Sequence, residues 1–331
     1  MMFLKQFFQL YKKYIFAIGI IILIFCCIHT FSPSSDKKLK NEYNKILLDL
    51  QGSANSDKDS LTACKKMLEL AEKDYTPAQR FVGNYYKNKG NFIQCENWFK
   101  RAAEKGDTIA AFNLGVFYSN GKYLSQNFSK AIYWYTKAAE QGYADAQYNL
   151  GLCYYNGKGV SQDFSKAVYW YKKAIKNGNV PAQNNLGFCY ENGTGLEQNN
   201  SKAIYWYTKA AEQGFAIAQC NLGTYYYKNK KFFKAVYWYT KAAKQGDIGG
   251  QNNLGYCYTY GFGTPKNYSK ALYWYTKAAE QGYEIAQLNL GRCYYNGKGV
   301  QQNFSKAVYW LTKAAEQGSE EAVELLNKIK K

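Results

Sequence analysis

Residues able to perform acid–base or nucleophilic chemistry are scarce in this chain of 331 residues. Its only histidine, His29, lies in an apolar N-terminal segment, so the remainder of the chain has neither a histidine base nor a histidine metal ligand. The usual pairing of a nucleophile with a histidine base therefore cannot form there. Four glutamates each follow a lysine by three residues on an expected helix, which predicts solvated ion pairs rather than converging catalytic carboxylates; they are Glu140, Glu212, Glu280 and Glu316. We predict a protein that is not an enzyme and uses no cofactor and no metal.

Two other patterns resemble chemical sites but have simpler structural explanations. The loop Gly157–Lys158–Gly159 lacks the spacing and the preceding strand of a phosphate-binding loop, so it is interpreted as a turn. Of the nine cysteines, four recur at one position of an internal repeat: Cys153, Cys189, Cys257 and Cys293. Neighbouring repeats hold such residues about 10 Å apart, whereas a disulfide needs Cα atoms within about 7 Å. We predict that these cysteines are small core residues with free thiols.

The elements that position these residues repeat along the chain. The seven tryptophans are spaced by 36 residues, with one interval of 32; they are Trp98, Trp134, Trp170, Trp206, Trp238, Trp274 and Trp310. A fixed period of this length marks stacked copies of one supersecondary unit. The seven units span residues 76–107, 108–143, 144–179, 180–215, 216–247, 248–283 and 284–319. Units one and five are shorter because they lack the glycine loop.

Each unit has the pattern of two helices. In the third unit, Ala146, Leu150 and Tyr154 share one face of a first helix, and Trp170 and Ala174 belong to the buried stripe of a second. A glycine recurs in the middle of each first helix, where it costs about 1 kcal/mol relative to alanine. This recurrence predicts close packing against an aromatic residue of the second helix. The glycines are Gly83, Gly115, Gly151, Gly187, Gly223, Gly255 and Gly291.

The combined pattern of Leu-Gly, Gly-x-Gly, Lys-Ala, Trp and Ala-Ala-Glu-Gln-Gly resembles the Sel-1-like repeat family, a relative of the tetratricopeptide repeats. The resemblance implies an all-α, right-handed α/α solenoid of seven helix-hairpin repeats. Such an array needs helical end caps, because its terminal units would otherwise expose apolar faces. Residues 32–75 predict a linker and a degenerate capping hairpin, and residues 320–331 predict a C-terminal capping helix. The apolar stripes of the hairpin are Leu39, Tyr43, Ile46, Leu47 and Leu50, and then Leu61, Cys64, Leu68 and Ala71.

Residues 1–31 have the composition of an N-terminal apolar helix that acts as a signal anchor or a signal peptide. The run from Tyr14 to Ile28 is apolar, and Lys5, Lys12 and Lys13 precede it, which favours an N-terminus that remains inside. The length of the run lies between a signal-peptide core and a full membrane span. We expect residues 14–31 to anchor the chain in a membrane, with the repeats on the exterior (periplasmic or extracellular) side. Secretion after signal cleavage is the alternative.

The outward face of each first helix is the candidate binding surface, because its residues vary between units while the core is constant. If Leu150 points inward, then Tyr148, Leu152 and Tyr155 project together to the opposite side. In the tetratricopeptide relatives this face lines the concave side and holds peptides, so the resemblance implies a protein or peptide partner. The groove candidates are Phe112, Tyr148, Leu152, Tyr155, Asn184, Phe188, Glu191, Tyr227, Asn252, Tyr256, Arg292 and Tyr295. Drift on an unconstrained surface is the competing interpretation.

An asparagine column runs beside this face: Asn113, Asn149, Asn185, Asn221, Asn253 and Asn289. An asparagine amide offers donors and an acceptor, so the column would either hold a peptide backbone or bond to the neighbouring repeat. Its presence in successive units favours the second role.

The formal net charge of +19 suggests a second kind of partner. Two lysines seven residues apart recur on the second helices, as at Lys166 and Lys173, with Tyr169 and its equivalents close by. Basic and aromatic side chains together bind polyanions such as nucleic acid, anionic lipid or a cell-wall polymer. Arginine, which phosphate recognition favours, is almost absent, so nucleic acid is the less favoured partner. The alternative is that the lysines solvate an outer face while tyrosine covers their methylene groups.

Overall fold

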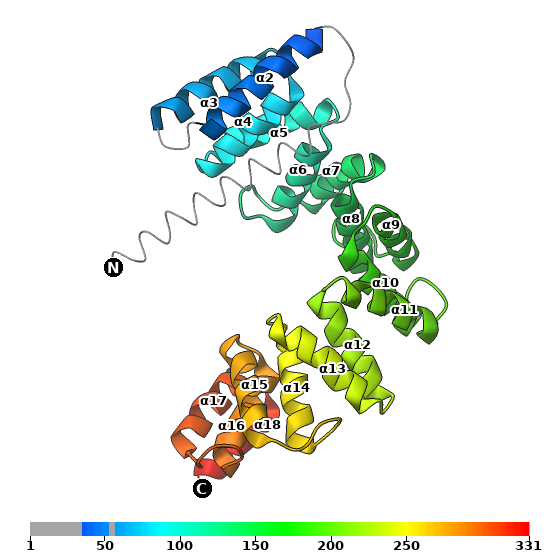
Figure 1. Ribbon diagram of the computed structural model, residues 1–331, viewed down its shortest axis with the longest axis vertical. Coiled ribbons are helices and arrows are strands. Elements are labelled where there is room, and N and C mark those ends of the chain that lie inside the picture. Colours follow the sequence, from blue (N-terminus) through cyan, green and yellow to red (C-terminus); the bar gives the residue numbers. More distant parts are fainter. Residues whose placement is uncertain (1–34, 53–56, 331) are drawn as a thin grey trace. The chain divides into compact units, whose positions relative to one another are not determined.

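The computed structural model describes residues 35–52 and 57–330, which fold into seventeen α-helices, α2 to α18, with no β-strand (Figure 1). The all-α, helix-hairpin architecture is therefore confirmed. The expected N-terminal apolar helix and the anchor at residues 14–31 lie outside these ranges. Within the ranges, no helix combines the length and the apolar character that crossing a membrane requires.

The described part of the chain forms two compact units, which are divided between Ser161 and Gln162. In each unit, consecutive helices pack side by side as hairpins (Figure 1). The helices of the first unit are α2 (Ser35–Gly52), α3 (Asp57–Glu72), α4 (Thr76–Asn88), α5 (Phe92–Glu104), α6 (Thr108–Asn120), α7 (Phe128–Glu140) and α8 (Ala144–Asn156). Those of the second unit are α9 (Phe164–Lys176), α10 (Val180–Asn192), α11 (Asn200–Glu212), α12 (Ala216–Lys228), α13 (Phe232–Lys244), α14 (Ile248–Tyr260), α15 (Tyr268–Glu280), α16 (Glu284–Asn296), α17 (Phe304–Glu316) and α18 (Glu320–Lys330).

Local sequence signals set the helix ends. The Asn199 side chain accepts a hydrogen bond from the Lys202 backbone N–H and so caps α11, and equivalent asparagine or aspartate residues cap α7, α9, α15 and α17. After α11 the chain turns at Gly214, whose φ of 88° suits glycine, and the next helix of the array begins two residues later. Most second helices of the array end in the same way, so one short sequence fixes the same turn repeatedly.

The mid-helix glycines allow the two helices of a hairpin to approach closely. A Cβ atom placed on Gly223 would lie 2.6 Å from Cδ1 of Tyr239, a core residue on the facing helix α13. The corresponding atom on Gly291 would lie 2.7 Å from Cγ of Leu311. The predicted packing against a large side chain is thus present at six of these glycines, and in the seventh repeat a leucine takes the place of the aromatic ring; the six are Gly83, Gly115, Gly187, Gly223, Gly255 and Gly291.

Buried glutamines join consecutive repeats, a role that the sequence analysis did not anticipate. Gln219 in α12 donates from Nε2 to the Ala211 carbonyl of the preceding repeat at 3.0 Å. Its own Oε1 accepts a hydrogen bond from Gln245 Nε2 at 2.8 Å, which ties it to the second helix of its own repeat. The same position is buried in other repeats, at Gln79, Gln147, Gln183, Gln251 and Gln287. The signal was the Ala-Gln (once Gly-Gln) pair that recurs in the first turn of these helices.

Helices α2 and α3 cover the first repeat at one end of the array. Tyr43 and Ile46 of α2 pack with Met67 and Leu70 of α3 in one cluster that also contains Trp98 of the first repeat. The expected stripe on α3 was only partly right, because Ala71 is buried as predicted but Met67 and Leu70 were omitted. Its fully buried residues are Ala63, Met67, Leu70 and Ala71, whereas Cys64 and Leu68 are only partly buried. The stripe is rotated because α3 lies on both α2 and α4, not on one partner.

At the other end, α18 covers the last repeat. Ala322 of α18 is fully buried in a cluster with Leu288 and Leu311, and Leu325 and Leu326 pack at its margin. This apolar contact shields the final hairpin from solvent.

Candidate interaction surfaces

The twelve predicted groove residues occupy three positions of the first helices, which we name after the fourth repeat as the Asn184, Phe188 and Glu191 positions. The Asn184 position contains Phe112, Tyr148, Asn184 and Asn252. The Phe188 position contains Leu152, Phe188, Tyr256 and Arg292. The Glu191 position contains Tyr155, Glu191, Tyr227 and Tyr295. Each position has a different environment in the structure.

The Asn184 position faces the next repeat more than solvent. Asn184 and Asn252 are each only 6% exposed, although they were predicted to line a groove. Asn221 Nδ2 donates to Asn184 Oδ1 at 2.9 Å, and Asn289 Nδ2 donates to Asn252 Oδ1 at 3.1 Å. The asparagine column is the other half of these bonds, so the structure favours its repeat-joining role. Buried amides that already bond to a neighbour are poor contacts for a ligand.

Aromatic residues at the same position are also partly covered. Phe112 is half-buried and lies 5.0 Å from the Tyr143 ring and 6.0 Å from the Tyr135 ring, measured between centroids. Tyr148 is half-buried as well. Contacts with Tyr135 of the same hairpin and with Tyr143 at the turn before α8 therefore cover part of the apolar surface of Phe112.

The Glu191 position satisfies a buried tyrosine of the second helix. The Tyr207 hydroxyl donates to Glu191 Oε2 at 2.8 Å. Burial and the neighbouring carboxylate raise the pKa of Tyr207 far above its usual value, so the phenol stays protonated. Ser119 and Thr259 take the same role in other repeats, at 3.0 Å from Tyr135 and 3.1 Å from Tyr275 respectively (hydroxyl to hydroxyl).

Variation at the Glu191 position thus follows a core requirement. In the seventh repeat the core residue is Leu311, which has no hydroxyl, and the position holds Tyr295, whose ring packs 5.8 Å from that of Phe304. In the fifth repeat, the Tyr239 hydroxyl donates to Thr224 Oγ1 at 3.1 Å. Thr224 thus takes the role that Glu191 has in the fourth repeat, and Tyr227 at the Glu191 position is not the acceptor. Tyr155 is half-buried. Differences between repeats at this position are therefore no evidence of a ligand.

The Phe188 position is the most accessible of the three. Phe188 is 42% exposed and Tyr256 is 37% exposed, and Leu152 is half-buried. Arg292 differs because it forms an ion pair with Glu321 of the capping helix at 2.7 Å. Among the three predicted positions, this one leaves bulky side chains exposed on the surface.

The second helices present a different surface, built from tyrosine, tryptophan and lysine. Tyr205 is 52% exposed and lies edge-on to Trp206, with centroids 5.0 Å apart. Lys209 Nζ lies 5.7 Å from the centre of the Tyr205 ring. Equivalent lysine–tyrosine pairs occur at residues 137 and 133, 173 and 169, 241 and 237, 277 and 273, and 313 and 309.

These lysine–tyrosine contacts correct one expectation. The glutamates three residues after the lysines, such as Glu212, are absent from the ion pairs within the described residues. A tyrosine one turn back offers Lys209 both a ring face for its ammonium group and apolar surface for its stem. This geometry favours the interpretation that the lysines solvate the outer face.

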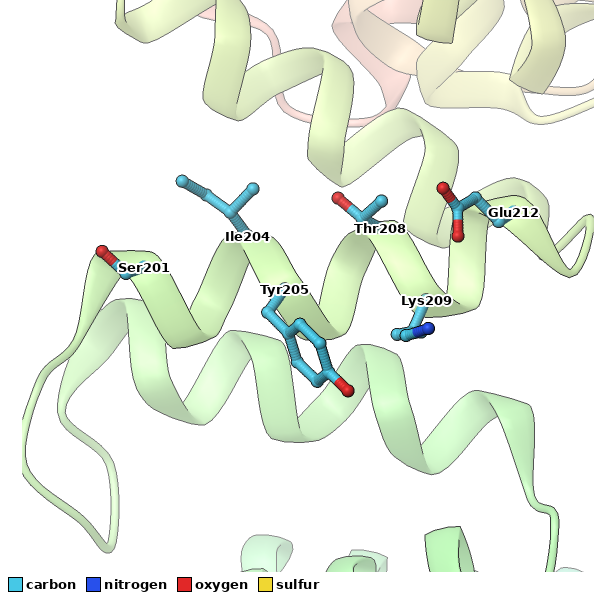
Figure 2. A pocket seen from close by; sticks show the side chains of 6 residues that line it. All are labelled: Ser201, Ile204, Tyr205, Thr208, Lys209 and Glu212. Atoms are coloured by element: carbon cyan, nitrogen blue, oxygen red, sulfur yellow. The ribbon is translucent and has the colours of Figure 1, made fainter.

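A shallow, open depression lies along α11 (Figure 2). Ile204, Thr208 and Glu212 point to one side of the helix, and Tyr205 and Lys209 point to the other (Figure 2). All of its lining residues come from this one helix, so the depression does not enclose a small molecule in the way that a ligand pocket does.

The seven cysteines in the described residues are free thiols. Those at the recurrent position are buried, as predicted; Cys189 and Cys257 are at most 1% exposed. Burial raises the pKa of the Cys189 thiol to about 11 and that of Cys257 to about 12. Neutral, inaccessible thiols are poor nucleophiles, so these cysteines serve as small core residues.

Comparison with known proteins identifies the repeat. The Sel1 repeat pattern matches residues 76–107, 108–143, 144–179, 180–215, 216–247, 249–283 and 285–319, most of the chain. The chain belongs to the Sel1 repeat family. Proteins with Sel1 repeats are generally scaffolds for protein interactions and are typically non-enzymatic.

Two solved structures of Sel1 repeat proteins are similar over long stretches. A Sel1 repeat protein from Oxalobacter formigenes is 29% identical, with 94% of this chain and 93% of that chain covered and a TM-score of 0.71. A protective antigen present in uropathogenic Escherichia coli strains is 34% identical, with a TM-score of 0.70. The alignment with the antigen covers 80% of this chain but only 58% of the antigen, so this chain spans just over half of its length. No curated protein matches the sequence.

Proposed function

We propose that this Sel1 repeat protein is a non-enzymatic scaffold that binds a partner protein or peptide through the first helices of its repeats. The observation that carries the proposal is the exposure of bulky side chains at the Phe188 position. Phe188 and Tyr256 remain accessible although neighbouring positions on the same helices are buried. Large exposed aromatic side chains on a rigid helical surface are typical anchors of protein interfaces.

The identity of the residue at this position changes between repeats, as from Leu152 to Phe188 to Tyr256, whereas Thr224 bonds to the core residue Tyr239. The surrounding helix is nearly constant, with the same leucine–glycine pair before the variable residue in most repeats. A constant frame that presents different side chains gives each repeat its own contact with a partner. Specificity then depends on how much more tightly these contacts bind one partner than another.

Photo-crosslinking from single positions tests this proposal. Benzoylphenylalanine replaces Phe188 in one variant and Tyr205, on the outer face of α11, in a matched control. Illumination of living cells is expected to give a discrete higher-mass adduct from position 188 and none, or a diffuse smear, from position 205. An adduct formed only from position 205 and removed by nuclease would instead support a polyanion partner.

We further propose that residues 14–31 hold the chain in a membrane with the repeats on the exterior side. The apolar run and the lysines that precede it support this arrangement. Protease added to intact spheroplasts is then expected to digest the repeats without prior lysis. Digestion only after lysis would place the repeats in the cytoplasm and exclude the proposal. A mature chain that is shorter by the N-terminal segment and found in the medium would indicate secretion.

A further inference from the structure

Repeats five and six carry an aromatic patch of five rings, one ring more than the cluster at the corresponding place in repeats one and two. Five rings contact one another in sequence: Tyr227, Phe232, Phe262, Tyr256 and Tyr260, with centroid separations between 4.5 and 6.2 Å. We call these five residues the aromatic patch. They come from the end of α12, the start of α13, the end of α14 and the loop after it. The patch therefore lies at the loop ends of two adjacent hairpins.

Part of the patch replaces the missing glycine loop of repeat five. A Cβ atom on Gly263 would lie 2.3 Å from the Phe232 carbonyl oxygen, so the loop of repeat six rests directly on the start of α13. Phe262 fills the space beside it, 4.9 Å from the Phe232 ring. Beside the other short repeat, Tyr123 fills the corresponding space, and its ring lies 4.7 Å from that of Phe92. Packing thus explains Phe262 and Phe232.

Packing does not explain the exposed tyrosines. Tyr260 is 52% exposed, whereas the equivalent residue beside the first short repeat is Asn120. In repeats three, four and seven the position is also asparagine, and its Nδ2 donates to the carbonyl one turn earlier; these are Asn156, Asn192 and Asn296. Phe233, the residue after Phe232, is 82% exposed, where most other repeats have serine. Exposed aromatic residues have replaced polar residues that suit the fold better.

The turn beside the patch has two lysines where the first short repeat has residues better suited to the turn. The first short repeat turns through Gly90 and caps its second helix with the Asn91 side chain. In repeat five these two residues are Lys230 and Lys231. Lys230 has a φ of 56°, the left-handed conformation that glycine adopts without strain. Lys231 provides no side-chain cap. Local stability favours glycine and asparagine, so the two positive charges need another explanation.

The stretch of sequence that carries the patch is almost entirely positive, although Lys228 forms an ion pair with Glu191 of the preceding repeat at 3.2 Å. Between residues 225 and 270 the acidic residues number one, Asp247, and its carboxylate caps α14 by accepting from the Gly250 backbone N–H. The same span contains eight lysines: Lys228, Lys230, Lys231, Lys234, Lys241, Lys244, Lys266 and Lys270. Repeat five also has Lys244 where five other repeats have glutamate, two residues before the closing glycine. Apolar rings with a basic rim complement an acidic segment that contains an apolar side chain.

We propose that the aromatic patch, with Lys230 and Lys231, is a docking site for an acidic peptide segment of a partner protein that contains a bulky apolar residue. This inference rests on the proposed scaffold function and assigns the partner's chemistry at one place. A nucleic acid fits less well. The rim is lysine without arginine, which is the better partner for phosphate.

Fluorescence anisotropy with the full-length chain tests the inference. The probe is a short fluorescein-labelled peptide of aspartate and glutamate with a central Trp-Leu pair. Three matched probes replace the Trp-Leu pair with serines, replace the acidic residues with lysines, or substitute a labelled oligothymidylate of equal charge. The first probe is expected to bind at least tenfold more tightly than the others.

Two variants restore the residues that other repeats carry. Tyr260→Asn removes an exposed ring, and the double variant Lys230→Gly with Lys231→Asn recreates the turn of the first short repeat. Each is expected to weaken binding of the acidic probe about tenfold, while the double variant melts at a higher temperature than the parent. If Lys230 and Lys231 were retained only for stability, their replacement could not weaken binding and raise the melting temperature together. The charge-matched control is Lys172→Gln with Lys176→Gln on α9, two exposed lysines away from the patch, which is expected to bind normally.

Several outcomes would overturn the inference. They are no binding of the acidic Trp-Leu probe, equal binding of the serine probe, tighter binding of oligothymidylate, or full binding by the restored variants. These outcomes leave crosslinking from position 188 unaffected, so a failure here is distinguishable from a failure of the scaffold function. Loss of the position-188 adduct with retained probe binding would contradict the scaffold proposal alone.

Discussion

The close approach between a mid-helix glycine and the facing core ring predicts the result of Gly223→Ala. The new methyl carbon would lie 2.6 Å from Tyr239 Cδ1 and 2.8 Å from Cε1, whereas carbon atoms prefer about 3.5 to 4.0 Å. The ring would have to move by roughly 1 Å. It is 3% exposed, and its hydroxyl is bonded to Thr224, so little space is available. Overpacking of this kind costs about 1 to 3 kcal/mol, and the upper part of that range applies here.

Helix propensity acts in the opposite direction, because alanine is better than glycine inside a helix by about 1 kcal/mol. The net loss in the free energy of unfolding is therefore about 2 kcal/mol. Repeat arrays need not unfold in a single step, so the local measurement is more direct than a global melt. Amide hydrogen exchange of α12 and α13, followed by mass spectrometry, is expected to accelerate roughly thirtyfold.

The matched control is Gly249→Ala in the first turn of α14. There the nearest atom to a new Cβ is Cys220 Sγ at 3.2 Å, and other repeats have isoleucine or aspartate at that place. The control is expected to exchange at the parental rate or more slowly. If Gly223→Ala also exchanges no faster than the parent, close packing against Tyr239 is not the reason for the repeated glycine.

Three further changes follow from the buried polar contacts. Gln219→Leu removes the hydrogen bond to the Ala211 carbonyl, which keeps its bond from the Gly214 N–H, and it also removes the acceptor of Gln245 Nε2, so the free energy of unfolding in urea is expected to fall by about 2 kcal/mol; an unchanged midpoint would mean that the glutamine is dispensable. Glu191→Ala removes the acceptor of the buried Tyr207 hydroxyl and is expected to cost about 1 to 3 kcal/mol by the same assay, and Tyr207→Phe added to it should recover part of that loss. Because the folded pKa of Cys257, about 12, exceeds the usual thiol value of 9.0, its contribution to stability is complete below pH 9 and is lost as the pH rises from 9 toward 12. Cys257→Ala is therefore expected to make the decline of the urea midpoint above pH 9 less steep, and an identical decline in both proteins would exclude the thiol as a cause.

Much of the fold was predictable because every repeat supplies the same information again. Tryptophan spacing gave the unit, and helical periodicity placed Leu150 and its equivalents in the core, where the structure has them. The capping hairpin has no second copy, and there the stripe on α3 was only partly right, with Met67 and Leu70 omitted. The glutamine column was missed because periodicity in apolar residues does not mark a polar side chain that is buried between two repeats.

The candidate surface was predictable only in part. Angles around a single helix place Asn184 and Phe188 on the same outward side, yet one is 6% exposed and the other 42%. The difference arises from the next repeat, which covers the first residue and leaves the second open, and a projection of one helix contains no neighbour. Similarly, Lys209 and Glu212 are suitably spaced for an ion pair, but the ring of Tyr205 lies within reach of the ammonium group.

The pairing of core tyrosines with the Glu191 position has a consequence for how such a gene can change. Unequal crossing-over between similar repeats in a gene adds or deletes copies of the repeat. A crossover between hairpins preserves each matched pair, such as Thr259 with Tyr275 or Tyr295 with Leu311. A crossover within the loop of a hairpin would join the first helix of repeat seven to the second helix of repeat six, and Tyr275 would lose the Thr259 hydroxyl. Copy number is therefore expected to vary by whole hairpins, with viable junctions in the turns between repeats rather than in the glycine loops.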